Sequence, residues 1–184
     1  FKINTKGTAL DGTEEMLLKN RKRSVAIAAR SIVRAGTGHS YWSKFDNKNK
    51  QLIEKIAKHL HSVLFKPEID TQIRTMDLPL AGNKSPIDAL KIIINLICVI
   101  LAPMESTKSK IDAFPIDETG DDTIATLEKI SKIFDLISGN SHGILGLHPA
   151  VYYYSDNGQH MPDLFIGVIL LFNRKLNDNC LLYT

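Results

Sequence analysis

Positive charges recur between residues 19 and 34, where they could bind phosphate groups. The cations of this stretch are Lys19, Arg21, Lys22, Arg23, Arg30 and Arg34. Helical spacing places Arg23, Arg30 and Arg34 near one face, so the three could follow a phosphate backbone together. Nothing in the pattern resembles a base-reading code, and we therefore predict weakly sequence-specific nucleic-acid binding. The alternative is a solvated helix face whose cations pair with acids one turn away.

The first ten residues hold a second candidate, which consists of Asn4, Thr5 and Gly7. A glycine after Asn-Thr lets the backbone turn tightly, and Asn, Thr and exposed amides just before a helix can bind phosphate oxygens. The same residues would also suit a capped loop in which Asn4 and Thr5 satisfy their own backbone. Spacing alone leaves both interpretations open.

The opening residues resemble a known family. Phe1-Lys2-Ile3-Asn4-Thr5-Lys6-Gly7 is similar to the Phe-x-x-x-Asn-Thr-x-Gly segment of GmrSD-type, ParB-like domains of bacterial defence proteins, with the leading aromatic one residue before Phe1. Similar stretches are Leu17-Leu18-Lys19-Asn20-Arg21-Lys22, Arg34-Ala35-Gly36-Thr37-Gly38-His39 and Gly146-Leu147-His148-Pro149-Ala150-Val151-Tyr152. The resemblance implies a parent protein that uses a nucleoside triphosphate to control DNA cleavage. It also implies that Asn4, Thr5 and Gly7 belong to the nucleotide-side loop.

The motif that completes the nucleotide site in that family, Asp-Gly-Gln-Gln-Arg, is absent. Asp156-Asn157-Gly158-Gln159-His160 is similar only in part, because it lies after the Asn-Thr element and lacks the arginine. The chain also begins at Phe1 instead of Met. We therefore expect a later part of a restriction or phage-defence protein, with no catalytic residues and no cofactor of its own. Its expected partners are DNA and the missing N-terminal half. The competing hypothesis is a non-catalytic helical protein-interaction module.

Other reaction centres are not indicated. Cys98 lies in an apolar run, where burial would raise the pKa of its thiol and make it inert. The sequence contains neither a Gly-x-Ser-x-Gly elbow nor a P-loop. His142, His148 and His160 fall in one irregular region but lack the paired spacing of zinc ligands, so we expect no metal site.

Composition and charge suit a single globular domain. The chain has 184 residues, of which 43% are hydrophobic and 23% charged. Its net charge of +3 is uneven: residues 1 to 70 carry 14 Lys and Arg against 7 Asp and Glu, and the remainder carry 9 against 13. The front part therefore suits an anionic partner. Two cysteines, and a longest apolar run well short of the roughly 20 residues of a membrane span, favour a cytoplasmic protein without a membrane contact.

Helical periodicity must position these residues. We expect an all-α fold, an irregular bundle of about five helices with a short extended segment at the N-terminus. Residues 1 to 12 would form the remnant of the ParB-like motif loop, residues 13 to 176 the helical domain, and residues 177 to 184 a tail. The expected helices cover residues 14–35, 47–66, 86–101, 121–137 and 162–176, and residues 103 to 120 would form a flexible polar connection.

Apolar residues at spacings of three, four and seven predict which faces are buried. The clearest stripe is Leu52, Ile53, Ile56, Ala57, Leu60, Val63 and Leu64. The helix over residues 86–101 is apolar nearly all round and should lie in the core. In the last helix the inward candidates are Leu164, Phe165, Val168, Ile169, Leu171 and Phe172.

Overall fold

The protein is an all-α bundle. A computed structural model describes residues 12–37, 42–65, 86–101, 111–138, 144–149, 152–157 and 161–177. In those ranges the chain forms α1 (Gly12–Lys19), α2 (Ser24–Val33), α3 (Asn47–Phe65), α4 (Pro86–Leu101), the 3-10 helix η1 (Ile111–Ala113), α5 (Asp121–Ser138) and α6 (Pro162–Asn177). The predicted fold class is confirmed. The predicted extended segment at the N-terminus lies outside the described residues.

Helix α2 lies at the centre and contacts α3, α4 and α5. Nine of its ten residues are buried. Three of them, Ala26, Ala28 and Ala29, are small enough for neighbouring helices to approach from several sides. The hydroxyl of Ser31 donates to the carbonyl oxygen of Ala28 at 2.7 Å, which satisfies its polar group inside the core.

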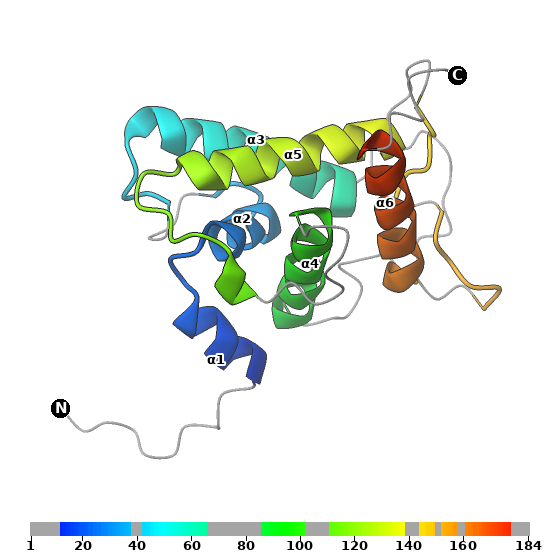
Figure 1. The fold of residues 1–184 in the computed structure, drawn as a ribbon, viewed down its shortest axis with the longest axis horizontal. Helices are drawn as coiled ribbons and strands as arrows, with labels where there is room; N and C mark the ends of the chain where they lie inside the picture. Colours follow the sequence, from blue (N-terminus) through cyan, green and yellow to red (C-terminus); the bar gives the residue numbers. More distant parts are fainter. Residues whose placement is uncertain are drawn as a thin grey trace.

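The other helices surround α2 (Figure 1). Helices α3 and α5 lie side by side along the upper edge of that view, α4 lies below them, and α1 and α6 lie at opposite ends of the bundle. Helix α4 contacts α2, α5 and α6, as expected for a core helix. No helix in the described part of the chain combines the length and the apolar character that a membrane crossing requires.

Helices α1 and α2 are separate, although the sequence predicted one helix over residues 14–35. Helix α1 ends at Lys19, and the backbone turns before α2 begins at Ser24. The side-chain amide of Asn20 donates to the carbonyl oxygen of Met16 at 2.9 Å, which helps to end α1. The break places the basic residues 19–23 in a turn instead of on a continuous helix face.

At the C-terminal end of α2, the backbone of Gly36 lies close to the backbone of α3. Gly36 has a φ of +67°, and its amide donates to the carbonyl oxygen of Ser31 at 2.9 Å. A Cβ at Gly36 would lie 2.2 Å from the carbonyl oxygen of Glu54. Glycine is therefore required here both by the backbone conformation and by the space. Nearby, Trp42 is fully buried and donates to the carboxylate of Glu54 at 3.2 Å.

Two predictions about packing are corrected. Residues 111–120, predicted to belong to a flexible connection, form η1 and an ordered loop. In α6, Phe165, Ile169 and Phe172 are buried as predicted, but Leu164 and Leu171 are exposed. Among the described helices, α4 and α5 contact α6 on one side, and the leucines of the opposite side are exposed.

Candidate nucleic-acid interface

The basic turn, residues Lys19 to Arg23, joins α1 to α2. Lys19, Arg21 and Lys22 are exposed. The residues from Leu18 to Arg23, together with Ile116, line a hollow of about 300 Å³. Three exposed cationic side chains, with the half-buried Arg23, therefore surround a small open depression, a geometry that suits an anionic group.

Residues 114–117 fix the basic turn through hydrogen bonds. The amide of Ser24 donates to the carbonyl oxygen of Pro115 at 3.1 Å. The amide of Asp117 donates to the carbonyl oxygen of Lys22 at 2.9 Å. Arg23 and Ile116 form an antiparallel bridge, and the Arg23 guanidinium donates to the carbonyl oxygen of Phe114. The turn is thus fixed by a segment about 90 residues away in the sequence.

Asp117 fixes this supporting segment in turn. Its carboxylate is buried and accepts hydrogen bonds from the amides of Thr119, Gly120 and Thr123 and from the hydroxyl of Thr123, at 2.6 to 3.1 Å. These contacts cap the first turn of α5. Gly120 has a φ of +99°, and a Cβ there would lie 2.8 Å from the Phe45 ring. Asp117 therefore supports the interface and is not available to a ligand.

One acid lies beside the basic turn. Glu118 approaches Lys22 at 3.6 Å and Lys44 at 4.0 Å, and the side chains of all three are more than one-third exposed. Exposed ion pairs of this kind contribute little to stability and are screened by salt. Lys22 can therefore exchange Glu118 for a phosphate at small cost.

The structure separates the arginines that the sequence placed on one face. Arg23 is half-buried, and its Nε donates to the side-chain oxygen of Asn20 at 2.8 Å. Arg30 is buried and donates to the carbonyl oxygen of Leu17 at 2.8 Å. Arg34 is exposed, but it lies at the far end of α2, about 16 Å along the helix axis from Arg23.

Arg23, Arg30 and Arg34 therefore do not form one exposed arginine face. The first two tie the basic turn and α1 to α2, because burying a guanidinium requires hydrogen-bond partners such as these carbonyl groups. We leave Arg23 and Arg30 out of the candidate interface, which consists of Lys19, Arg21 and Lys22. The contribution of Arg34 stays a separate prediction.

The other predicted binding residues, Asn4, Thr5 and Gly7, lie outside the described residues. Their role as a nucleotide-side loop stays a prediction.

Titratable groups elsewhere form internal contacts. Burial raises the pKa of Cys98 to about 11, so its thiol stays protonated at neutral pH, as predicted. Burial lowers the pKa of His148. His59 contacts the carboxylate of Asp135 at 3.0 Å, whereas His61 contacts the carbonyl oxygen of Ile32 at 2.9 Å. Among the residues that the structure describes, no three His, Cys, Asp or Glu side chains gather as metal ligands would.

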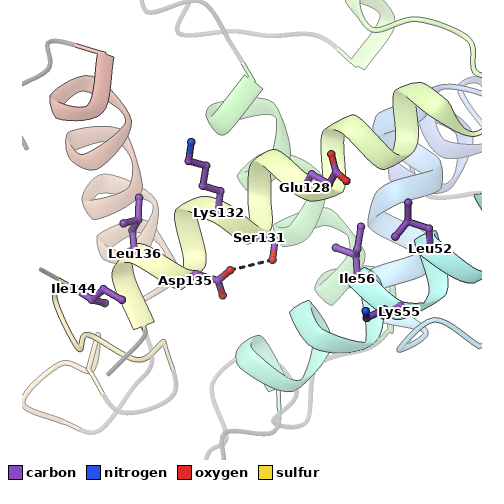
Figure 2. A pocket seen from close by; sticks show the side chains of 9 residues that line it. All are labelled: Leu52, Lys55, Ile56, Glu128, Ser131, Lys132, Asp135, Leu136 and Ile144. Atoms are coloured by element: carbon purple, nitrogen blue, oxygen red, sulfur yellow. Dashed lines mark hydrogen bonds between the residues drawn. The ribbon is translucent and has the colours of Figure 1, made fainter. Parts of the chain in front are cut away.

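A second hollow, of about 490 Å³, lies between α3 and α5 (Figure 2). Leu52 and Ile56 of α3 and Leu136 of α5 contribute apolar surface to it. The Ser131 hydroxyl donates to the Asp135 carboxylate at 3.3 Å, so that acid is shared with His59. The hollow carries both Lys55 and Lys132 and both Glu128 and Asp135, and the mixture of charges does not select a ligand of one sign.

Two residues of the interface were not predicted from the sequence. Asn20 is buried at the end of α1 and orients Arg23, and Ile116 forms one wall of the hollow. Asparagine is a common residue at helix ends, but Asn20 falls inside the single helix predicted over residues 14–35, so its role was missed. The position of Ile116 depends on a long-range contact that no local pattern contains.

Searches with the chain find no matching protein family, no matching curated protein and no matching solved structure.

Proposed function

We propose that the basic turn contacts the phosphate backbone of DNA, and that the chain is the helical, non-catalytic part of a ParB-like, nucleotide-dependent DNA-processing or defence protein. The observation that carries the first part is the exposure of Lys19, Arg21 and Lys22 around one hollow. Their supporting residues are hydrogen-bonded, so the cations are presented on an ordered frame. Contacts of this type read charge and not base sequence.

The second part of the proposal has its support in the sequence. Asn4, Thr5 and Gly7 match the family's nucleotide-side segment, and the companion Asp-Gly-Gln-Gln-Arg motif is missing from the chain. A nucleoside triphosphate would therefore bind to the parent protein, in a cytoplasmic setting where DNA is accessible. Determining the coding sequence upstream of Phe1 tests this part, since an Asp-Gly-Gln-Gln-Arg motif there would identify the family.

DNA binding is tested by fluorescence anisotropy with a short duplex at low salt. The test variant carries Lys19→Gln, Arg21→Gln and Lys22→Gln, and the control carries Lys55→Gln, Lys58→Gln and Lys132→Gln. All six side chains are exposed, and both variants lose three positive charges. We expect the wild type and the control to bind, with log K falling against log salt at a slope of about −2.7 for three phosphate contacts.

The test variant should lose at least tenfold in affinity. If the two variants bind equally, only the net charge matters and the basic turn is not an interface. If the wild type does not bind at low salt, the DNA proposal fails.

A second candidate function is a protein-interaction module. Leu18 is 48% exposed and Ile116 is 56% exposed, and both line the same hollow. Apolar side chains beside cations would suit a protein partner, such as the missing N-terminal half, more than a phosphate backbone. Leu18→Ser with Ile116→Ser separates the two functions. DNA affinity should be unchanged in this variant, whereas co-purification with the upstream polypeptide would be lost if the hollow binds protein.

A further inference from the structure

The outer face of α6 is apolar although it lies in solvent. Leu164, Leu170 and Leu171 are 48%, 50% and 56% exposed. They lie on the side opposite Phe165 and Ile169, which are buried in the bundle. In the described part of the chain α6 lies at one end of the bundle, with α4 and α5 on its inner side (Figure 1). Three neighbouring exposed leucines indicate an interaction surface.

The middle of this face has no side chain. Gly167 is exposed, and a Cβ built on it meets nothing within 4 Å. It lies one turn from Leu164 in one direction and from Leu170 and Leu171 in the other. A glycine at this position costs helix stability compared with alanine, yet it lets a second backbone approach closely.

The charges at the two ends of the face are opposite. Asp163 is exposed in the first turn of α6, and Arg174 and Lys175 are exposed in the last turn. Helical spacing puts Asp163, Gly167, Leu170 and Arg174 in one row, and Leu164, Leu171 and Lys175 in the next. The face is therefore acidic, then apolar, then basic along its length. Such a face is complementary to a copy of itself turned end for end.

We propose that a second copy of this chain docks on the outer face of α6, with the two α6 helices antiparallel around a two-fold axis at Gly167. Leu164 of each copy then faces Leu170 of the other, and each Asp163 lies toward the basic last turn of the other helix. The antiparallel arrangement also opposes the two helix dipoles favourably. One helix face is smaller than the about 1,200 Å² of total area at the low end of stable interfaces, so we expect a dissociation constant on the order of 10 to 100 µM.

Sedimentation equilibrium of the full chain from 5 to 500 µM, a concentration range chosen about that constant, tests the association. Leu171→Glu places a negative charge in the apolar part of the face, opposite Asp163 of the other copy, and should weaken association at least tenfold. Leu145→Glu is the matched control, because Leu145 is another exposed leucine, at 44%, and belongs neither to α6 nor to the basic turn. Circular dichroism melts verify that both variants fold. A chain that stays monomeric throughout this range, or that associates equally in both variants, overturns the proposal.

Disulfide trapping tests the geometry. In a Cys180→Ser background, Gly167→Cys should cross-link to itself, because Gly167 lies on the two-fold axis. Leu164→Cys should cross-link to Leu170→Cys when the two variants are mixed, and neither Leu164→Cys nor Asp163→Cys should cross-link to itself. Cross-linking of Asp163→Cys to itself would indicate parallel helices and would contradict the proposal.

Charge reversal supplies a second readout. Asp163→Lys should weaken association, and adding Arg174→Glu and Lys175→Glu to the same chain should restore it. A further variant that ends at Asn177 tests whether the end of the chain itself covers the outer face of α6. If that variant associates through α6 while the full chain does not, the seven residues beyond Asn177 cover the face, and the proposal fails for the full chain.

Discussion

Asp117 is buried and joins the start of α5 to the basic turn. Its carboxylate accepts four hydrogen bonds at the start of α5, and its amide donates to the carbonyl oxygen of Lys22 in the basic turn. A buried carboxylate with this many donors is well satisfied. The position of the proposed DNA contacts therefore depends on a residue that does not contact DNA.

Asp117→Ala should lower the free energy of unfolding by about 2 to 3 kcal/mol, because it leaves several buried amides without acceptors and removes the cap of α5. Urea denaturation followed by circular dichroism measures the change. Asp112→Ala is the control, since Asp112 is exposed on η1 and its loss should cost no more than about 0.5 kcal/mol. Equal losses in the two variants would show that the carboxylate contacts do not stabilise the fold.

Tyr153 is a buried residue with an unsatisfied polar atom. Its hydroxyl has no hydrogen-bond partner among the described residues, and its ring packs on Phe165 with centroids 5.0 Å apart. Tyr153→Phe keeps the ring and removes the desolvated hydroxyl, so it should raise the free energy of unfolding by about 1 kcal/mol. Urea denaturation measures the gain, and the exposed Tyr152→Phe should show none.

The same variant should change the response to alkaline pH. Burial raises the pKa of Tyr153 from 10 to about 12. Between these values the unfolded chain releases a proton that the folded chain keeps, so the wild type loses stability as the pH rises from 10 to 12. Tyr153→Phe should lose less stability across this window. An identical loss in both proteins would contradict the burial of an unpaired phenol.

At the level of elements, local patterns predicted the helices well where one face is buried. The stripe of α3 shows this, since Ile53, Ala57, Leu60 and Leu64 are buried as predicted. The break between α1 and α2 was missed because its cause is only partly local: besides the contact of Asn20 with Met16, it depends on a distant segment. Arg23 bonds to a carbonyl group 91 residues away, and only the folded chain brings the two together.

The candidate interface was predicted in part for a similar reason. The positive charges of Lys19, Arg21 and Lys22 were sufficient to predict a candidate anion-binding surface. Helical spacing does put Arg30 on the same side of α2 as Arg23 and Arg34, but spacing alone does not show that this side is covered at Arg30, which is buried. Once the chain turns at residue 20, Arg30 points back to the carbonyl oxygen of Leu17. In α6, helical periodicity cannot distinguish a leucine that the fold buries from a leucine that stays exposed on the surface.

The contact between α2 and α3 can be tested at Gly36. Gly36→Ala should destabilise the protein by about 2 to 4 kcal/mol, because the new Cβ would meet the Glu54 carbonyl oxygen at 2.2 Å and the φ is positive. Gly146→Ala is the matched control, with a φ of +64° and nothing within 4 Å of the new atom. Thermal unfolding should give a loss of only about 1 kcal/mol for Gly146→Ala. Equal effects would exclude the close approach of the two helices.

On the scale of the whole molecule, the two proposed surfaces are far apart. The basic turn lies beside α1, at the end of the bundle opposite α6 (Figure 1). Their effects should therefore be independent. We expect Leu171→Glu to leave binding to a short duplex unchanged, and the triple basic-turn variant to leave self-association unchanged. Anisotropy and sedimentation of both variants measure this, and strong coupling would indicate that the surfaces are not separate.

Helix α2 is enclosed on nearly every side. Its backbone amides cannot reach solvent through a small local opening, because no edge of the helix is exposed. Hydrogen–deuterium exchange in α2 should therefore require unfolding of the entire bundle, whereas α6, which is covered on one side only, should exchange through smaller fluctuations. The slowest-exchanging peptides would then be those of α2, Ser24–Val33, and their rates would report the global stability directly.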